Sequence, residues 1–141
     1  MPGAQSFAIE VQISFGHCDA AGIVFYPNYF RWLDRCFHTF LLHRHGGHAA
    51  LCERLGARGI GLMSADAKFL SPGHDGDLIS VEMAAPNWRE RSFTLPYQVR
   101  IGDRVLLKGE EVRGLFGDRD GRMTALPVTP LRDILEAVKS G

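Results

Sequence analysis

The sequence predicts a single α+β domain, residues 1–141, in which an antiparallel sheet curls around one long helix. Three observations predict this fold. A strand pattern of period two opens the chain, a long and broadly apolar helical pattern follows it, and four further strand patterns come next with no comparable helix between them. Consecutive strands tend to pair with one another, and a helix that is apolar around most of its surface must be enclosed by other structure.

The first strand is predicted by strict alternation between apolar residues and polar or small ones. Its apolar positions are Phe7, Ile9, Val11, Ile13 and Phe15. Such alternation is typical of a strand with one face buried and the other exposed to solvent. We therefore expect the sheet to begin here, with all five apolar side chains directed towards the core.

The long helix is expected to begin at Pro27, because proline is favoured at the first helical position. Apolar residues then recur at steps of three and four, at Phe30, Leu33, Phe37, Phe40 and Leu41. The Gly46-Gly47 pair is expected to end the helix, and residues 48–55 are expected to form a further short turn of helix.

The second half of the chain is dominated by strand patterns. These cover residues 61–69, 77–84, 93–101 and 105–116. Pro96 predicts an edge position or a bulge in the third of them, because proline cannot donate a ladder hydrogen bond. Residues 117–122 are expected to form a polar loop, with Thr129 and Pro130 as cap and first position of a last helix that extends to Val138.

The composition excludes several classes of protein. Sixteen basic and sixteen acidic residues give a net charge of zero, which argues against a nucleic-acid binder. No apolar run approaches the roughly 18 residues that a membrane span needs, and residues 1–5 do not resemble a signal peptide. Three widely spaced cysteines, Cys18, Cys36 and Cys52, do not form a disulfide framework, so we expect a cytoplasmic protein.

The loop between the first strand and the long helix holds the strongest chemical signal. Asp19 lies in a Gly/Ala-rich segment seven residues ahead of Tyr26 and next to the predicted helix start. The first-turn N–H groups of a helix lack intrahelical partners and carry the positive end of its dipole. A carboxylate beside such donors suits chemistry at a carbonyl, where the donors hold the developing oxyanion. The alternative is that Asp19 merely caps its turn.

Three segments carry a resemblance to a known family. They are DAAGIVFYPNY from Asp19 to Tyr29 followed by RWLD at 31–34, FLSP at 69–72 followed by Gly76 and Asp77, and WRERSF from Trp88 to Phe93. With these segments the chain resembles the 4-hydroxybenzoyl-CoA thioesterase family of hotdog-fold enzymes, from about Phe7 to Leu126. The first segment is quite specific, the second marks the fold more than a substrate, and the third is similar to the basic segment that meets coenzyme A.

The resemblance implies hydrolysis of an acyl-CoA thioester at a site shared between two subunits of a homo-oligomer, a dimer or a homotetramer. It implies Asp19 as nucleophile or general base and the backbone N–H of Tyr26 as the donor that polarises the thioester carbonyl, with no metal or cofactor. The candidate substrate-binding residues are His17, Gly22, Phe25, Trp32, Phe69, Arg89 and Arg91. Phe25, Trp32 and Phe69 are expected to line the acyl pocket.

Two of these candidates, Arg89 and Arg91, also have a reading from the sequence pattern. They alternate with Glu90 at an expected strand start, so both guanidiniums can point to one face and grip the phosphates of coenzyme A. The alternative is a solvated strand end with an ion pair to Glu90.

An aromatic acyl group, such as hydroxybenzoyl or aminobenzoyl, is the leading substrate class, and short- or medium-chain aliphatic acyl-CoA is the alternative. A non-catalytic acyl-CoA binder and a dehydratase that uses His17 are the other classes. A metal site at His43, His45 and His48 is disfavoured by their spacing. Cys18 is taken as structural, and so is Asp34, which is expected to pair with Arg31 or Arg35 on its own helix.

Overall fold

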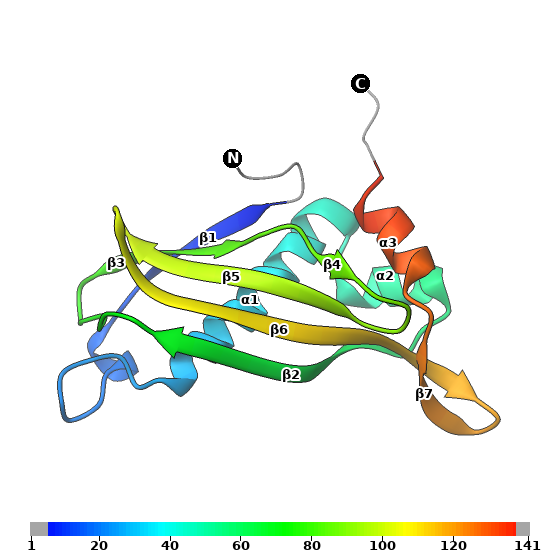
Figure 1. Cartoon of the computed structure of the whole chain (residues 1–141), viewed down its shortest axis with the longest axis horizontal. Coiled ribbons are helices and arrows are strands. Elements are labelled where there is room, and N and C mark those ends of the chain that lie inside the picture. Colours follow the sequence, from blue (N-terminus) through cyan, green and yellow to red (C-terminus); the bar gives the residue numbers. More distant parts are fainter. Residues whose placement is uncertain (1–5, 138–141) are drawn as a thin grey trace.

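A computed structural model describes residues 6–137 (Figure 1). One antiparallel sheet has the strand order β1-β3-β5-β6-β2, with the short strands β4 and β7 paired to β5 and β6. The strands are β1 (Phe7–Gln12), β2 (Gly59–Phe69), β3 (Leu78–Met83), β4 (Asn87–Trp88), β5 (Phe93–Ile101), β6 (Arg104–Arg119) and β7 (Arg122–Leu126). The helices are η1 (Phe15–His17), α1 (Pro27–His45), α2 (His48–Leu55) and α3 (Thr129–Leu135).

The sheet curls around α1, which confirms the predicted α+β class and the hotdog fold (Figure 1). The sheet face towards α1 is built by alternation, because Phe93, Leu95, Tyr97 and Val99 of β5 are all buried. Full burial of one large apolar side chain contributes about 1.5–3 kcal/mol, so this shared core fixes where α1 lies on the sheet.

Helix α1 has the limits that the sequence predicts. Pro27 occupies its first turn, and Gly46 ends it with φ 81°, a left-handed conformation that favours glycine. The apolar residues of the helix are buried on several sides, with Leu33, Phe37 and Leu41 inaccessible to solvent. The short helix α2 follows directly, and its range, His48–Leu55, is also the predicted one.

Two expectations about single residues are wrong. Phe15 does not continue the first strand into the core; it lies in η1 and is 81 % exposed, because the chain leaves the sheet after Ile13. Pro96 lies in β5, an interior strand between β3 and β6, and the irregularity of that strand falls between Val99 and Arg100. The Pro96 carbonyl accepts the Ala84 N–H at 2.9 Å, so the Pro96 nitrogen on the same side of the strand also faces the chain just past the end of β3. The sheet tolerates the missing N–H because the β3 ladder has already ended there.

Two expectations near the end of the chain also need correction. Residues 117–122 are not a loop, because β6 continues to Arg119 and pairs with β7 through a tight hairpin. Asp120 and Gly121 form its turn with φ of 52° and 76°, and an Asp-Gly pair is a common hairpin signal. Thr129 begins α3 but is not its cap; Val128 precedes it, with no side-chain cap bond.

Some expectations fall on residues that the structure does not describe. Val138 and residues 1–5 lie outside the described range. Within residues 6–137, no helix is both long enough and apolar enough to cross a membrane.

Candidate active site

The Asp19 loop is a compact turn held by its own backbone. The Asp19 carbonyl accepts the Gly22 N–H at 2.9 Å, and the Asp19 N–H donates to the carbonyl of Ile23 at 3.0 Å. The Asp19 carboxylate accepts the Ala21 N–H at 2.9 Å. Gly22 has φ 80°, which explains why glycine occupies this position. The side chain of Asp19 therefore caps its turn and is exposed to solvent at the same time.

His17 anchors this loop to the beginning of α1. Its carbonyl accepts the Phe25 N–H at 2.9 Å and the Asn28 side-chain amide at 2.9 Å. Its ring nitrogen Nδ1 accepts the Ser14 N–H at 3.0 Å, and the ring packs edge-on against Trp32 at a centroid distance of 5.1 Å. His17 thus has a structural task within one protomer.

The first turn of α1 leaves one backbone donor unused. The Asn28 N–H donates to the Phe25 carbonyl at 3.0 Å, the Tyr29 N–H donates to the Tyr26 carbonyl at 3.1 Å, and Pro27 has no N–H. Within residues 6–137 the Tyr26 N–H has no acceptor. A helix N-terminus with one unpaired N–H is a site for an anion or a developing oxyanion.

Asp19 and the beginning of α1 border one cavity of about 360 Å³. Its lining residues are Gly16, Cys18, Asp19, Phe25, Pro27, Asn28 and Arg31. The fold therefore places the carboxylate and the first helical turn around the same space. This arrangement is what attack on a carbonyl carbon requires.

A second cavity of about 370 Å³ lies between α1 and the end of β2, and Tyr26 lines this cavity and not the one that Asp19 borders. Phe69 lines it, is 50 % exposed, and packs against Tyr26 and Tyr29 at centroid distances of 6.2 and 5.9 Å. Phe25 instead lines the Asp19 cavity. Trp32 is buried in the core and lines neither of these two cavities.

The turn between β4 and β5, which contains Arg89 and Arg91, lies at the end of the sheet opposite to the connection between β1 and α1, which contains Asp19 (Figure 1). The expected alternation of the two arginines along a strand is not observed, because both belong to the turn between β4 and β5. The Arg89 N–H closes this turn by donating to the Ser92 carbonyl at 2.9 Å. The Arg91 guanidinium donates to the Ala125 carbonyl at 2.8 Å. Among the described residues Glu90 forms no ion pair with either arginine; its carbonyl accepts the Val128 N–H.

Comparisons with known proteins identify the family of this chain. The family model of the thioesterase superfamily matches residues 21–108. A relative, 4-hydroxybenzoyl-CoA thioesterase of Pseudomonas sp. strain CBS-3, is 32 % identical over 133 residues, 89 % of this chain and 93 % of the relative. The chain belongs to the 4-hydroxybenzoyl-CoA thioesterase family.

Solved structures of thioesterases have the same fold as this member of the family. The structure of a 4-hydroxybenzoyl-CoA thioesterase from Pseudomonas sp. strain CBS-3 superposes with a TM-score of 0.80 at 28 % identity and covers 94 % of this chain and 99 % of that one. A gentisyl-coenzyme A thioesterase superposes with a TM-score of 0.72 at 27 % identity, over 86 % and 95 % of the two chains.

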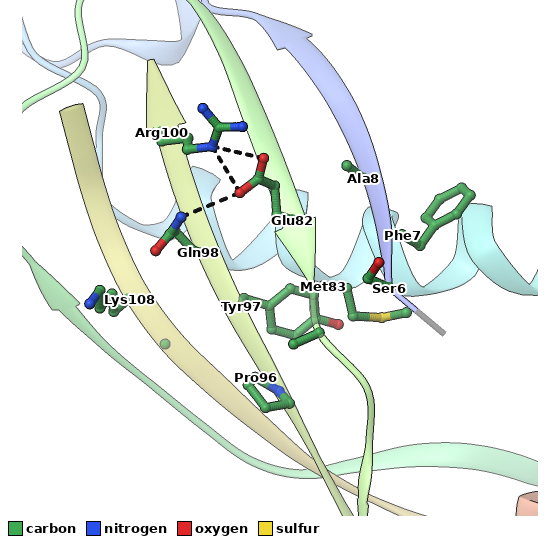
Figure 2. A pocket seen from close by; sticks show the side chains of 12 residues that line it. Ser6, Phe7, Ala8, Glu82, Met83, Pro96, Tyr97, Gln98, Arg100 and Lys108 are labelled. Carbon is green, nitrogen blue, oxygen red and sulfur yellow. Dashed lines mark hydrogen bonds and ion pairs between the residues drawn. The ribbon is translucent and has the colours of Figure 1, made fainter. Parts of the chain in front are cut away.

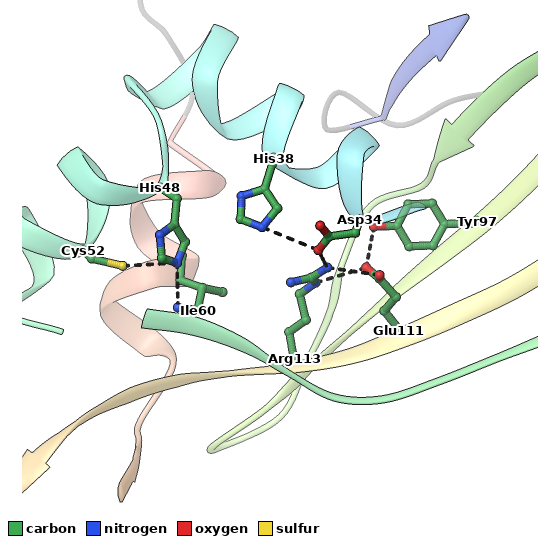
Figure 3. Close-up of polar contacts among 8 residues, drawn as sticks. All are labelled: Asp34, His38, His48, Cys52, Ile60, Tyr97, Glu111 and Arg113. Atoms are coloured by element: carbon green, nitrogen blue, oxygen red, sulfur yellow. Dashed lines mark hydrogen bonds and ion pairs between the residues drawn. The ribbon is translucent and has the colours of Figure 1, made fainter. Parts of the chain in front are cut away.

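In this thioesterase-family chain, a polar network lies between the sheet and α1, with Glu111 and Arg113 buried and Asp34 exposed (Figure 3). Arg113 donates to Glu111 through Nε and Nη2, both at 3.0 Å, and to Asp34 at 2.7 Å, while the Tyr97 hydroxyl donates to Glu111 at 2.7 Å. The ion-pair partners of Asp34 are Arg113 of β6 and His38 of α1, at 3.5 Å, and not Arg31 or Arg35 as expected. Burial, and then the charge of Glu111, raise the pKa of Tyr97.

Sequence reasoning missed Glu111 and Arg113, although the strand pattern contains a signal for them. They share the inward face of β6 with Leu107 and Leu115, and each is only 2 % exposed. Two opposite charges two residues apart on a buried face predict a pair that neutralises itself.

His48 lies beside this network and accepts the Ile60 N–H through Nε2 at 3.0 Å. Burial, and then the nearby charges of His38 and Arg113, lower the pKa of His48, so its ring is a neutral acceptor at the beginning of β2. Within residues 6–137 no three His, Cys, Asp or Glu side chains are grouped as a metal site would need.

A third cavity, of about 750 Å³, lies on the outer face of the sheet, away from α1 (Figure 2). Its charged groups are partly paired, because Glu82 accepts hydrogen bonds from Arg100 at 2.9 and 3.0 Å and from Gln98 at 3.3 Å. Burial raises the pKa of Glu82, but the hydrogen bonds from Arg100 and Ser80 outweigh it and the net shift is downward. None of the predicted site residues lines this cavity.

Proposed function

We propose that this protein hydrolyses an acyl-CoA thioester, with an aromatic acyl group, to a free acid and coenzyme A. One observation carries the proposal: the Asp19 carboxylate borders the same cavity as Pro27 and Asn28 of α1, and the N–H of Tyr26, the residue before Pro27, has no acceptor among the described residues. Family membership supports the same reaction, since the relative's name gives a 4-hydroxybenzoyl-CoA thioesterase.

In the proposed reaction the thioester oxygen accepts a hydrogen bond from the Tyr26 N–H, and the helix dipole stabilises the charge that develops there. Asp19 either attacks the carbonyl carbon, forming an anhydride that water then hydrolyses, or deprotonates the attacking water. In both routes the carbon–sulfur bond breaks and coenzyme A leaves as a thiolate that takes up a proton. The carboxylate thus provides the nucleophile or the base, and the helix N-terminus stabilises the oxyanion.

The aromatic acyl class is supported by two observations. The names of both relatives specify aromatic acyl groups, 4-hydroxybenzoyl and gentisyl. In this chain Phe25 and Phe69 expose about half of their surface on either side of Tyr26, where an aromatic ring can pack against them. Short- or medium-chain aliphatic acyl groups are the alternative, since such a surface also accepts alkyl chains.

A site shared between subunits is supported by the distance between its two parts. The β4–β5 turn with Arg89 and Arg91 lies at the opposite end of the sheet from the connection that contains Asp19, and β5 alone spans roughly 25–30 Å. If these arginines bind the coenzyme A phosphates, the thioester of the same substrate molecule must lie beside the Asp19 of another protomer. The free edge of β2, with Leu62 and Met63 about half exposed, offers a surface for a second copy. We therefore propose a homo-oligomer, a dimer or a homotetramer.

The proposed compartment is the cytoplasm. Cys18, Cys36 and Cys52 are all free thiols, as a reducing compartment keeps them.

Steady-state hydrolysis across a panel of benzoyl-, hydroxybenzoyl-, butanoyl- and hexanoyl-CoA tests the proposal, with thiol release as the readout. We expect an aryl-CoA to have the highest kcat/KM and Asp19→Asn to lose several orders of magnitude in kcat. Tyr26→Phe is the control, because only its main chain is proposed to act, and it should stay near wild type. Preference for an alkyl-CoA would change only the substrate class. No hydrolysis by the wild type would overturn the proposed activity, and a fully active Asp19→Asn would overturn the role of Asp19. Hydration of an enoyl-CoA would instead indicate a dehydratase.

A further inference from the structure

We infer that Asn28, with its amide oriented by Arg31, is a positioning residue that fixes the Asp19 loop against the first turn of α1. The inference rests on the proposed function, because it concerns the distance between the Asp19 carboxylate and the Tyr26 N–H. Asn28 lies in the segment from Asp19 to Tyr29 that carries the family resemblance, but its positioning role follows from the hydrogen bonds around His17.

Asn28 belongs to the helix and to the loop at once. Its backbone N–H donates to the Phe25 carbonyl at 3.0 Å and so closes the turn that contains Tyr26. Its side-chain Nδ2 donates at 2.9 Å to the carbonyl of His17, two residues before Asp19. One residue therefore links the segment with the proposed oxyanion donor to the segment with the proposed carboxylate.

The orientation of the Asn28 amide is fixed from the other side. Arg31 donates from Nη1 to the Asn28 Oδ1 at 3.5 Å, a long hydrogen bond from one helical turn further on. With Oδ1 facing a guanidinium, Nδ2 must face the His17 carbonyl, because only the NH₂ group can donate to it. Both Asn28 and Arg31 line the cavity that Asp19 borders.

The Asp19 loop needs such a link because its remaining hydrogen bonds are local or lead away from the helix. Asp19 itself bonds to Ala21, Gly22 and Ile23 within the turn, and Val24 donates to the Gly73 carbonyl. Two hydrogen bonds join the chain ahead of Asp19 directly to the segment that begins α1. The His17 carbonyl accepts both, one from the Phe25 N–H and one from the Asn28 side chain. A displacement of about 1 Å in a reacting group can cost 100-fold in rate. Losing one of the two bonds should therefore affect turnover more than substrate binding.

Asn28→Ala tests the inference, measured for kcat, KM and thermal unfolding alone and combined with Asp19→Asn. We expect kcat to fall about 10- to 100-fold with KM within about twofold of wild type. In the Asp19→Asn background the same change should have no further effect on the residual rate, because the group it positions is gone. Arg31→Met should reduce kcat in the same direction by less, and it provides a second variant if Asn28→Ala folds poorly.

Gln12→Ala is the matched control. Gln12 also donates a side-chain amide to a backbone carbonyl, that of Gly76 at 2.6 Å, but outside the Asp19 cavity. It should leave kcat unchanged. Wild-type turnover in Asn28→Ala, a rise in KM alone, or an equal loss in the Asp19→Asn background would each overturn the inference. An inactive wild type would overturn the proposed function instead, so the two failures are distinguishable.

Discussion

The Arg113 guanidinium donates a 2.7 Å hydrogen bond to the Asp34 carboxylate, so a buried cation of β6 is tied directly to the middle of α1 (Figure 3). The same guanidinium holds Glu111 through two further bonds and lies 4.5 Å from the centre of the Phe37 ring. Burial lowers the pKa of Arg113, but its bonds to Glu111 outweigh burial and raise it, so the group stays charged. This contact fixes the lateral position of the helix whose first turn borders the candidate active site.

Arg113→Met should be strongly destabilising. It removes the only cation bonded to Glu111 among the described residues and leaves a carboxylate that is 2 % exposed without its counter-charge. Breaking a buried ion pair from one side typically costs about 3–5 kcal/mol. Urea unfolding followed by circular dichroism measures this loss. Arg100→Met, which breaks the more exposed pair with Glu82, is the matched control and should cost much less. An equal loss of unfolding free energy in Arg113→Met and Arg100→Met would contradict the prediction that a buried ion pair costs more to break than an exposed one.

The limits of helices and strands that follow from local sequence patterns could be predicted, whereas contacts between residues far apart in the sequence could not. The bounds of α1 follow from Pro27 and Gly46, and both are visible in the chain. The pairing of Asp34 with Arg113 joins residues 79 apart, and helical spacing offered a nearer but wrong partner, Arg31. Likewise, Pro96 is compatible with an interior strand only because β3 ends beside it, which no single strand pattern reveals.

The candidate site divides in the same way. The proximity of Asp19 to the beginning of α1 is implied by a short loop between them. The role of Asn28 depends on which carbonyl its amide meets, a matter of side-chain direction. The separation of Arg89 from Asp19 follows from the register of β1, β3 and β5, because the end of β1 that leads to Asp19 lies at the far end of β5 from the turn with Arg89.

Gly73→Ala should destabilise the fold by steric conflict. A Cβ on Gly73 would lie 2.8 Å from the Tyr29 hydroxyl and 3.0 Å from Ile13 Cδ1. Overpacking of this kind costs about 1–3 kcal/mol. Tyr29→Phe removes the nearer obstacle, and its hydroxyl is buried without a hydrogen-bond partner among residues 6–137, so deletion of that group should cost little.

The double variant Gly73→Ala/Tyr29→Phe should therefore be more stable than Gly73→Ala alone. Chemical denaturation of the four proteins of the cycle gives the coupling free energy. Strict additivity would mean that the two groups do not meet.

His48 should make stability depend on pH in the mildly acidic range. Its folded-state pKa is lowered by burial and by the charges of His38 and Arg113, so the unfolded chain binds the extra proton first as the pH falls. The contribution of His48 is complete above about pH 6.5, the unfolded value, and is lost as the pH falls through the folded-state pKa. Protonation also turns the acceptor of the Ile60 N–H into a donor.

Urea midpoints measured from pH 8 to pH 5 test this dependence. His48→Gln should flatten the curve, whereas His43→Gln, which removes an exposed imidazole from the end of α1, should follow wild type. A wild-type slope in His48→Gln would show that other groups cause the acid loss.

Replacing Arg89 and Arg91 together by Met should raise KM for acyl-CoA about 10-fold or more and leave kcat within about twofold. Loss of interactions made equally in ground and transition states has this signature. The same acyl group on N-acetylcysteamine, which lacks the nucleotide phosphates, should be hydrolysed as well by the variant as by wild type. Arg54→Met, an exposed arginine of α2, is the control. A fall in kcat with both thioesters would assign the arginines to folding or chemistry instead.

Mixing two defective variants should restore activity if the site is shared between subunits. Asp19→Asn keeps both arginines, and Arg89→Met/Arg91→Met keeps the carboxylate. The two parts of the site lie at opposite ends of the sheet of one protomer. A mixed oligomer therefore contains sites in which the intact Asp19 of one protomer meets the intact arginines of the other protomer. The proteins are unfolded together, refolded, and assayed at a substrate concentration well below the raised KM.

Activity above the sum of the two separately refolded variants is the expected result, and for random dimers it should approach a quarter of the wild-type rate, because half of the dimers are mixed and each has one complete site. An exactly additive mixture would place both parts of the site within one protomer. That outcome would require the β4–β5 turn to reach Asp19 along the whole length of β5, which the antiparallel register of Phe93 with Arg113 and of Ile101 with Arg104 opposes.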